Sequence, residues 1–380
     1  MTFHSPPRFL DSRTNALHPL DERRWRSETG HPLMVTPLPG IGRDDIDRAV
    51  RSIWRYRASL PLEINQAISL GEGCTPIIEK PWGPLTPLFK LEWFNPTSSF
   101  KDRGAAVMIS FLKQLGIDSI LEDSSGNGGA AVAAFGAAAG MQVRIVVPES
   151  TSSSKTAQIK AYGAEIQLVP GPRVEAEHEA IRQSEKRFYA SHNWHPFFLQ
   201  GTKSIAYEIW EDLGFKAPDN IVIPAGAGSN VLGCYIGFSE LLAAGQIHRL
   251  PRIFAAQPEN CSPIDASFKA GADDCVPVEV KPTVAEGTSI KQPIRMREIL
   301  SALRQSGGST VAVPESHIID AIKKLGELGL YAEPTSATAA AALEMLHQNG
   351  AIHSRETTVV LLTGAGLKST TFMTTLFAGR

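Results

Sequence analysis

The stretch NIVIPAGAGSNVLGCYIGFSELLAAG, residues 220–245, joins a short apolar run to a longer helical pattern through a glycine-rich turn. The run NIVIP is rich in isoleucine and valine and predicts a buried strand. The turn GAGSN, residues 226–230, lies between that strand and the helix, and its glycines allow the backbone to approach a ligand closely. A strand followed by a helix of this length is typical of a βα unit in a mostly parallel sheet.

The same alternation recurs along much of the chain. Further apolar runs that precede or follow helical stretches lie at 119–123, 143–148, 164–169, 252–257 and 357–363. We therefore predict an α/β fold built on open, mostly parallel sheets with helices on both faces. Helical patterning begins near Arg43, the segment 258–292 reads as a long irregular loop, and residues 1–45 read as an arm that wraps the body.

Composition excludes several classes of protein. The chain has 380 residues, 43% of them hydrophobic and 20% charged, which suggests a soluble protein of about two domains. A net charge of −2 predicts no nucleic-acid partner, and no apolar run approaches the roughly 20 residues that span a membrane. No secretory leader is recognisable, so we expect a cytoplasmic protein. The four cysteines form no CxxC pair and are expected to be reduced thiols.

The stretch NPTSSFKDRG, residues 95–104, places Lys101 at the start of a predicted helix. Val107, Met108, Phe111 and Leu112 form one apolar face of that helix. A lysine at a helix N-terminus faces the positive end of the dipole, which disfavours the ammonium form and favours a nucleophilic amine. The alternative is an ordinary surface lysine beside a helix cap.

Three glycine-rich turns follow predicted strands: SSGNGG (124–129), GAGSN (226–230) and LLTGAG (361–366). Turns at the carboxyl ends of parallel strands gather at one edge of a sheet, where such folds bind ligands. GAGSN offers backbone N–H groups to an anion but matches neither a Walker loop nor GxGxxG. A candidate imine lysine, a phosphate cradle and polar turn residues fit pyridoxal phosphate, although other phosphate ligands remain possible.

The motifs also resemble a known family. IWRYRASLPL, LGEGCTP, NPTSSFKDRG, SSGNGGAAVAA, PAGAGSN, EPTSATAAAALE and LLTGAGLK occur in the order found in fold-type II pyridoxal-phosphate enzymes, most closely the threonine synthases. The resemblance runs from about residue 43 to residue 368. It implies a two-domain fold, with the cofactor in the cleft between the domains.

By that resemblance, Lys101 carries the cofactor as a Schiff base and Asn127 contacts the 3-hydroxyl oxygen of its ring. Thr363 is expected at the pyridine nitrogen, and Phe100 beside the ring. The cofactor phosphate is expected on the turn formed by Gly226, Ala227, Gly228, Ser229 and Asn230.

The family reaction converts O-phosphohomoserine and water to threonine and phosphate, with Lys101 moving protons at the substrate's carbons. The expected substrate-side residues are Ser98, Ser124, Gly128, Lys155 and Asn193. Lys155 could equally be a solvated surface lysine.

His192 and His195 are expected to be packed or exposed rather than catalytic. The N-terminal residues 1–42 resemble a zinc-ribbon-like leader without its cysteines, so no metal is expected; packing of Trp25 and Leu33 should hold them. The predicted large domain covers 43–105 and 205–380, and the small mobile domain 106–204. Members of the fold usually form homodimers.

Two positions depart from the family pattern. Gly128 and Ala131 stand where relatives often carry threonine and serine hydroxyls that bind the substrate's anionic groups, and Ser98 replaces the glycine usual in the lysine motif. The departures leave open a related lyase or dehydratase that acts on a different, non-phosphorylated amino acid. A cofactor-binding protein that has lost catalysis is a third possibility.

Overall fold

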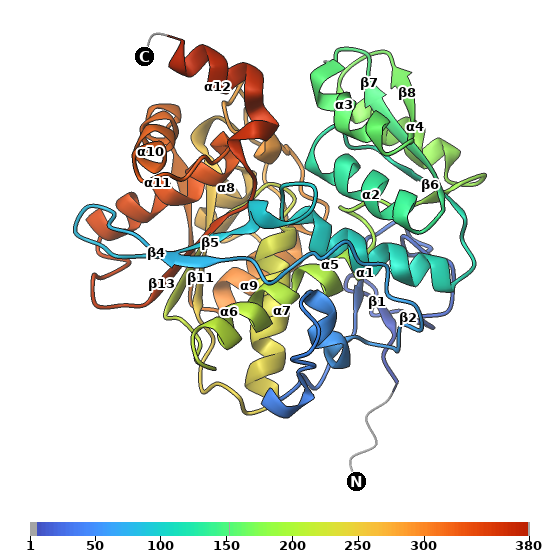
Figure 1. Ribbon diagram of the computed structural model, residues 1–380, viewed down its shortest axis with the longest axis horizontal. Coiled ribbons are helices and arrows are strands. Elements are labelled where there is room, and N and C mark those ends of the chain that lie inside the picture. The colour runs from blue at the N-terminus through green and yellow to red at the C-terminus, as the bar shows by residue number, and fades with distance from the viewer. Residues whose placement is uncertain (1–5, 152, 379–380) are drawn as a thin grey trace. The chain divides into compact units, whose positions relative to one another are not determined.

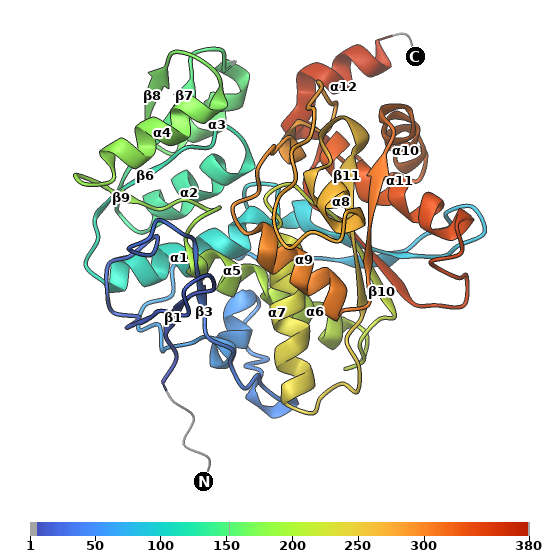
Figure 2. The same ribbon diagram turned by 180° about the vertical axis from the view of Figure 1, so that it is seen from behind.

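The computed structural model describes residues 6–151 and 153–378, without the side chains of 153–155. By its contacts the chain forms two compact units: unit 1, Met1–Glu72 with Lys101–Ser204, and unit 2, Gly73–Phe100 with Ile205–Arg380. Figure 1 colours the chain by residue number, and Figure 2 shows it from behind.

This grouping differs from the expected boundaries, because residues 43–72 lie in unit 1. The physical reason is that Ile53, Trp54 and Ile68 belong to the apolar cluster around the helix that starts at Lys101. Which residues move together during catalysis stays a prediction.

Unit 1 contains a parallel sheet in the order β8-β7-β6-β9. Its strands are β6 (Ser119–Glu122), β7 (Gln142–Pro148), β8 (Glu165–Val169) and β9 (Phe188–Tyr189). Its helices are α1 (Lys101–Gln114), α2 (Asn127–Ala138), α3 (Ser153–Ala161), α4 (Arg173–Gln183) and α5 (Pro196–Thr202).

The two faces of this sheet bury alternate residues, as the pleat of a strand requires. Ile120 and Ile145 join the large cluster that contains residues of α1, α2 and α3. Leu121 and Val146 face the opposite way and pack with Ala176 of α4. Figure 2 shows α4 on its own side of the sheet. Helices therefore cover both faces, as predicted.

The N-terminal residues form a small antiparallel sheet in the order β2-β1-β3. Its strands are β1 (Phe9–Asp11), β2 (Leu17–His18) and β3 (Leu33–Val35). Phe9 meets Phe111 and Phe197 edge to face, with ring centroids 6.3 and 6.0 Å away. Trp25 and Leu33, the expected packing residues, are both buried.

Unit 2 contains a six-stranded sheet in the order β12-β11-β10-β13-β5-β4, parallel except for the edge strand β4. Its strands are β4 (Ile77–Glu79), β5 (Leu88–Leu91), β10 (Asn220–Pro224), β11 (Arg252–Pro258), β12 (Ser309–Val313) and β13 (Thr358–Leu362). The helices after residue 203 are α6 (Ser204–Asp212), α7 (Ser229–Ala243), α8 (Pro263–Lys269), α9 (Met296–Gln305), α10 (Glu315–Glu327), α11 (Pro334–Gln348) and α12 (Thr370–Phe377).

One face of this sheet packs against α10 and α11. Val222, Phe254 and Val360 share an apolar cluster with residues of those helices. Their strand neighbours, such as Ile223 and Leu361, point the other way and are also fully buried. Both faces of the central strands therefore lie inside the unit.

Two local predictions were wrong. The helix expected from Arg43 is absent; the segment forms only 3₁₀ turns, at Arg43–Asp45 and Ile53–Ser59. The segment 258–292, expected to be a loop, contains α8, which Pro263 begins. Proline suits the first turn of a helix because its missing N–H would have no partner there.

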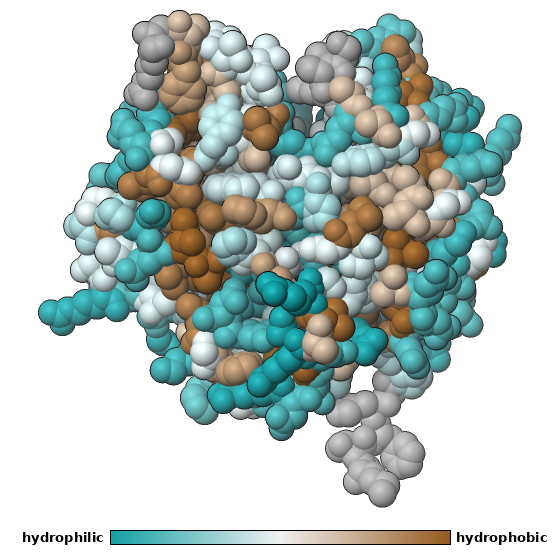
Figure 3. Space-filling view, in the orientation of Figure 1, coloured by the Kyte–Doolittle hydropathy of each residue, from teal (hydrophilic) through white to brown (hydrophobic). Residues whose placement is uncertain are grey.

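The surface mixes polar and apolar residues on the face drawn in Figure 3. None of the helices in the described part of the chain combines the length and the apolar character needed to cross a bilayer.

The packing of Phe9 predicts how strongly the N-terminal sheet stabilises unit 1. We expect Phe9→Ala to lower the free energy of unfolding by about 3–5 kcal/mol, because it leaves a cavity beside two buried rings. Leu17→Ala is the control, since Leu17 is 53% exposed and its truncation should change stability by about 0.5 kcal/mol or less. Urea unfolding followed by circular dichroism measures both. Equal midpoints for the two variants would contradict the prediction.

Candidate active site

In unit 2 the strand order reverses between β10 and β13. From β10 the chain proceeds to β11 and β12 on one side, then returns to β13 on the other side of β10. In parallel sheets this reversal separates the loops at the carboxyl ends of the two strands and leaves room for a ligand. The turn Gly226–Asn230 follows β10, and Thr363 follows β13, so the structure brings these predicted residues to one edge.

The turn after β10 has no space for side chains at its glycines. Gly228 has a φ of +81° and precedes α7; a Cβ there would overlap Ile299. A Cβ at Gly226 would lie 2.9 Å from Thr288 Cα. The N–H groups in the first turn of α7 have no acceptor within the helix, so they can bind an anion.

A buried amide supports the same interpretation. Asn230 is 3% exposed, and its side-chain oxygen has no hydrogen-bond partner among the described residues. A buried polar atom of this kind is costly unless a ligand or water satisfies it. The turn therefore fits a bound phosphate group.

The residues before Lys101 pair with the turn after β13. The Phe100 N–H donates to the Thr363 carbonyl at 3.0 Å, and the Ala365 N–H donates to the Ser98 carbonyl at 3.3 Å. Ser98 has a φ of +68°, which explains why glycine is the residue expected at this position. Thr363 is buried, and its hydroxyl lies 3.2 Å from the Ser336 hydroxyl. Thr363 is thus held on the edge that also carries Gly226–Asn230.

Lys101 is the first residue of α1, as the sequence predicts. Its Nζ lies 5.5 Å from the ring centroid of Phe198. That ring packs directly on α1, since a Cβ at Gly104 would lie 2.5 Å from it. The chain passes from unit 2 to unit 1 between Phe100 and Lys101.

In unit 1 the strand order reverses between β6 and β9, because β7 and β8 lie on one side of β6 and β9 on the other. Ser124 and Asn127 follow β6, and Asn127 begins α2. Asn193 follows β9, and its N–H donates to Ser191 Oγ at 3.3 Å. The adjacent carboxyl ends of β6 and β9 therefore bring these predicted residues to one edge. Lys155 lies on α3, and its side chain is outside the described residues.

A buried polar cluster at this edge was missed from the sequence. Glu122 ends β6, Asp123 follows it, and both are almost fully buried. The Tyr189 hydroxyl donates to Asp123 Oδ1 at 2.7 Å, and His192 Nδ1 lies 3.1 Å from Glu122 Oε1. The only sequence signal was the pair of acids that closes the apolar run SILED.

Burial controls the titration of this cluster. Burial raises the pKa of Glu122. Burial and the adjacent Glu122 charge together raise the pKa of Asp123 to about 6. Burial and the nearby Lys101 charge hold the pKa of His192 well below its usual range. Strongly perturbed groups beside a candidate imine lysine are typical of an active site.

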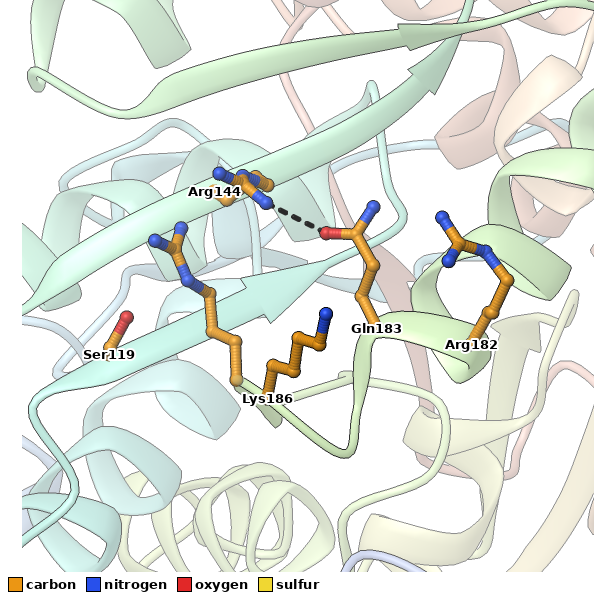
Figure 4. A pocket seen from close by; sticks show the side chains of 6 residues that line it. Ser119, Arg144, Arg182, Gln183 and Lys186 are labelled. Atoms are coloured by element: carbon orange, nitrogen blue, oxygen red, sulfur yellow. Dashed lines mark hydrogen bonds between the residues drawn. The ribbon is translucent and has the colours of Figure 1, made fainter.

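A basic pocket of about 380 Å³ lies at the opposite, amino-terminal edge of the unit 1 sheet. Figure 4 shows Arg144 reaching Gln183, with Arg182 and Lys186 nearby. Glu165 lies 2.9 Å from Arg144 and compensates part of the positive charge. Because open α/β sheets bind ligands at the carboxyl edge, this pocket is separate from the candidate active site.

Comparison with known proteins identifies the family. The family profile described as "Pyridoxal-phosphate dependent enzyme" matches residues 68–364. The chain belongs to this family. It is a pyridoxal-phosphate-dependent lyase, and the predicted cofactor is confirmed.

Curated relatives at moderate identity are threonine synthases. The enzyme of Methanocaldococcus jannaschii is 34% identical over 86% of this chain and 83% of its own length. The threonine synthase of Methanosarcina acetivorans is 35% identical over 83% of this chain and 80% of its own length.

Solved structures share the fold at lower identity. An L-serine ammonia-lyase from Rhizomucor miehei aligns with a TM-score of 0.71 at 21% identity, covering 83% of this chain and 99% of that one. Maize serine racemase aligns with a TM-score of 0.68 at 23% identity, covering 80% of this chain and 92% of the racemase chain. The predicted two-domain fold-type II class is confirmed.

The titration of Asp123 predicts a pH-dependent stability. Its folded pKa, about 6, lies above the unfolded value of about 3.9, so the folded state binds more protons in this window. The free energy of unfolding should therefore fall as pH rises from about 4 to about 6, by roughly 3 kcal/mol at most from this residue. Asp123→Asn should remove that contribution.

Urea unfolding of the wild type and the variant at several pH values measures the difference. Asp118→Asn is the control, since the Asp118 side chain is 71% exposed, and it should keep the wild-type pH dependence. Parallel curves for the wild type and Asp123→Asn would refute the assignment.

Proposed function

We propose that this enzyme converts O-phospho-L-homoserine and water to L-threonine and phosphate. The observation that carries the proposal is the match to several curated threonine synthases, the first two at 34% and 35% identity over more than four fifths of this chain. Comparable coverage of the relatives means that the match is not restricted to the cofactor-binding motifs.

The candidate site residues would each have a role in holding the cofactor. The Gly226–Asn230 turn would bind its phosphate, Thr363 would meet its ring nitrogen, and Asn127 would contact its 3-hydroxyl oxygen. Phe100 would lie beside the ring. When bound, the cofactor withdraws electrons from the substrate and makes its carbon-bound protons removable. The hydroxyl of Thr363 would be a weaker partner than a carboxylate, so the ring nitrogen would not need to be protonated and this withdrawal would be reduced.

Lys101 would hold the cofactor and then move protons at the substrate's Cα and Cβ. The phosphate leaves from Cγ, and water adds at Cβ. Ser98, Ser124, Asn193 and Lys155 would donate hydrogen bonds to the anionic groups of the substrate, which charge-assisted bonds bind well.

A second candidate is a lyase or dehydratase that acts on a non-phosphorylated amino acid. The observation that favours it is the absence of hydroxyls at Gly128 and Ala131. Ala131 is fully buried in the apolar cluster of unit 1, so it offers no polar contact. The threonine synthase matches favour the first candidate.

Three further features belong to the proposal. Residues 106–204 would act as a small mobile domain that closes over the substrate. The enzyme would form a homodimer, and it would work in the cytoplasm.

Replacing the lysine tests the cofactor assignment. We expect Lys101→Ala to lose the visible absorbance of bound pyridoxal phosphate, because no amine remains to bond its aldehyde. Lys113→Ala, on the solvent side of the same helix, is the matched control and should keep the wild-type spectrum. A spectrum of Lys101→Ala that equals the wild type's would rule out this role for Lys101.

The substrate assignment is tested by product analysis. Incubation with O-phosphohomoserine should release phosphate and threonine in equal amounts. A parallel incubation with L-serine or L-threonine, assayed for a 2-oxo acid, should give little product. The reverse pattern would favour the second candidate and reject the first.

A further inference from the structure

The basic pocket at the amino-terminal edge of the unit 1 sheet has the size of a ligand site. Its volume is about 380 Å³, and pockets for small molecules have roughly 300–1,000 Å³. Four of the six side chains that line it are cations, and none of the six is acidic. They are Ser119, Arg144, Arg182, Gln183, Lys186 and Arg187. A small anion is the class of ligand whose charge fits this lining.

The topology of the unit gathers these cations at one edge. Arg144 is the third residue of β7, and Arg187 immediately precedes β9. Arg182 lies in the last turn of α4, and Lys186 lies just beyond that helix. The negative end of a helix dipole favours basic side chains, which accounts for Arg182 and Lys186 without a ligand. It does not account for Arg144 and Arg187, which belong to the strands.

Arg144 and Gln183 form a fixed floor in this pocket. The Arg144 guanidinium donates to Gln183 Oε1 at 2.8 Å, and it also lies 2.9 Å from Glu165 Oε1. Gln183 Nε2 donates in turn to Gln167 Oε1 at 2.9 Å, which connects α4 to β8. These bonds are made within unit 1, so the floor exists before any ligand binds. A preformed site loses less conformational freedom on binding.

The donors that can reach a ligand surround this floor. Figure 4 shows Lys186 between Ser119 and Gln183. The Lys186 ammonium makes no ion pair with any residue in the described part of the chain. Arg187 Nη1 lies 3.4 Å from Glu165 Oε2, longer than the roughly 2.7–2.9 Å of a strong charge-assisted bond. Lys186 and Arg187 can therefore turn to an anion at little cost.

Two acids offset part of the positive charge. Glu165 lies beside Arg144 and Arg187, and Glu179 pairs with Arg182. The hydrogen bond from Arg144 lowers the pKa of Glu165, so this carboxyl is ionised at neutral pH. Four cations and two paired carboxylates leave an excess of two positive charges. The pocket therefore attracts a dianion.

We infer that this pocket binds a small ligand that carries a phosphate group, with Lys186, Arg187 and Ser119 as its direct donors. A phosphate dianion matches the charge excess. Its terminal oxygens accept bonds from several directions, as the lysine, the guanidinium fork and the hydroxyl require, whereas a carboxylate offers two oxygens in one plane. A nucleic acid fits less well, because the two flanking carboxylates repel a chain of phosphates. The ligand would not displace the substrate, since Ser124 and Asn127 lie at the opposite edge of this sheet.

Binding of inorganic pyrophosphate to the holoenzyme at low salt tests the site. Titration calorimetry should show saturable binding that weakens about tenfold in Lys186→Ala, which corresponds to the loss of one charge-assisted hydrogen bond. Lys160→Ala is the matched control, because Lys160 is an exposed lysine on α3 of the same unit and does not line the pocket. It should bind pyrophosphate as the wild type does.

A variant with the opposite effect separates this pocket from general attraction to a basic surface. Glu165→Gln removes a negative charge and releases Arg187, so pyrophosphate should bind roughly two- to fivefold more tightly, the range of an exposed ion pair. Citrate, a tricarboxylate, should bind more weakly than pyrophosphate. Citrate that binds equally well or better contradicts the assignment to a phosphate group.

Hydrogen exchange followed by mass spectrometry locates the bound probe. Pyrophosphate should slow exchange in peptides that cover residues 182–187 of the wild type, and not in Lys186→Ala at the same concentration. Peptides that cover Gly226–Asn230 report an anion at the candidate active site instead. The inference is overturned if the wild type binds no pyrophosphate, if Lys186→Ala binds it equally well, or if protection is confined to Gly226–Asn230. None of these measurements uses turnover, so their result is independent of the proposed function.

Discussion

The hydrogen bond from the Phe100 N–H to the Thr363 carbonyl is the contact that holds the segment before Lys101 on the unit 2 sheet. It ties the residues before Lys101 to the turn after β13, the strand that occupies the reversal point of the unit 2 sheet. Ser98 adopts a left-handed conformation to make this pairing, and Gly364 has no room for a side chain because Glu333 lies against it. Backbone strain of this kind persists where the surrounding structure holds it. Lys101, the first residue of α1, directly follows Phe100 in the chain.

The parallel sheets of the two units share one topological feature, a reversal of strand order. From β10 in unit 2 and from β6 in unit 1, the chain adds strands in one direction and then returns to the other side of that strand, so that two glycine-rich or polar turns lie at one carboxyl edge. In unit 2 the turns follow β10 and β13; in unit 1 they follow β6 and β9. Within its own unit, each reversal brings together turns that are far apart in the sequence, which explains why the motifs are short and widely spaced.

The strands β7 and β10, which carry long apolar runs followed by a serine-rich and a glycine-rich turn, were predictable from the sequence, and so was the start of α1. The sequence did not predict β9, which has two residues, because so short a strand has no periodicity. The apolar pattern of α1 predicted a single buried face. In the structure Asp102 and Arg103 are buried too, and the Arg103 guanidinium donates a hydrogen bond to the Ser204 hydroxyl. The contact between Glu122 and His192 joins residues 70 positions apart and depends on the pairing of β6 with β9, which no local pattern reveals.

The acids at the carboxyl end of β6 distinguish this region from an ordinary apolar core. Burying two adjacent carboxyls costs stability, and apolar residues of similar volume would pack there more favourably. Burial raises the pKa of both carboxyls, that of Asp123 to about 6. Glu122 accepts the backbone N–H of His192 and lies beside His192 Nδ1, while Asp123 accepts the Tyr189 hydroxyl. The segment Tyr189–His192 supplies the donors for both acids, and it reaches them only because β9 pairs with β6.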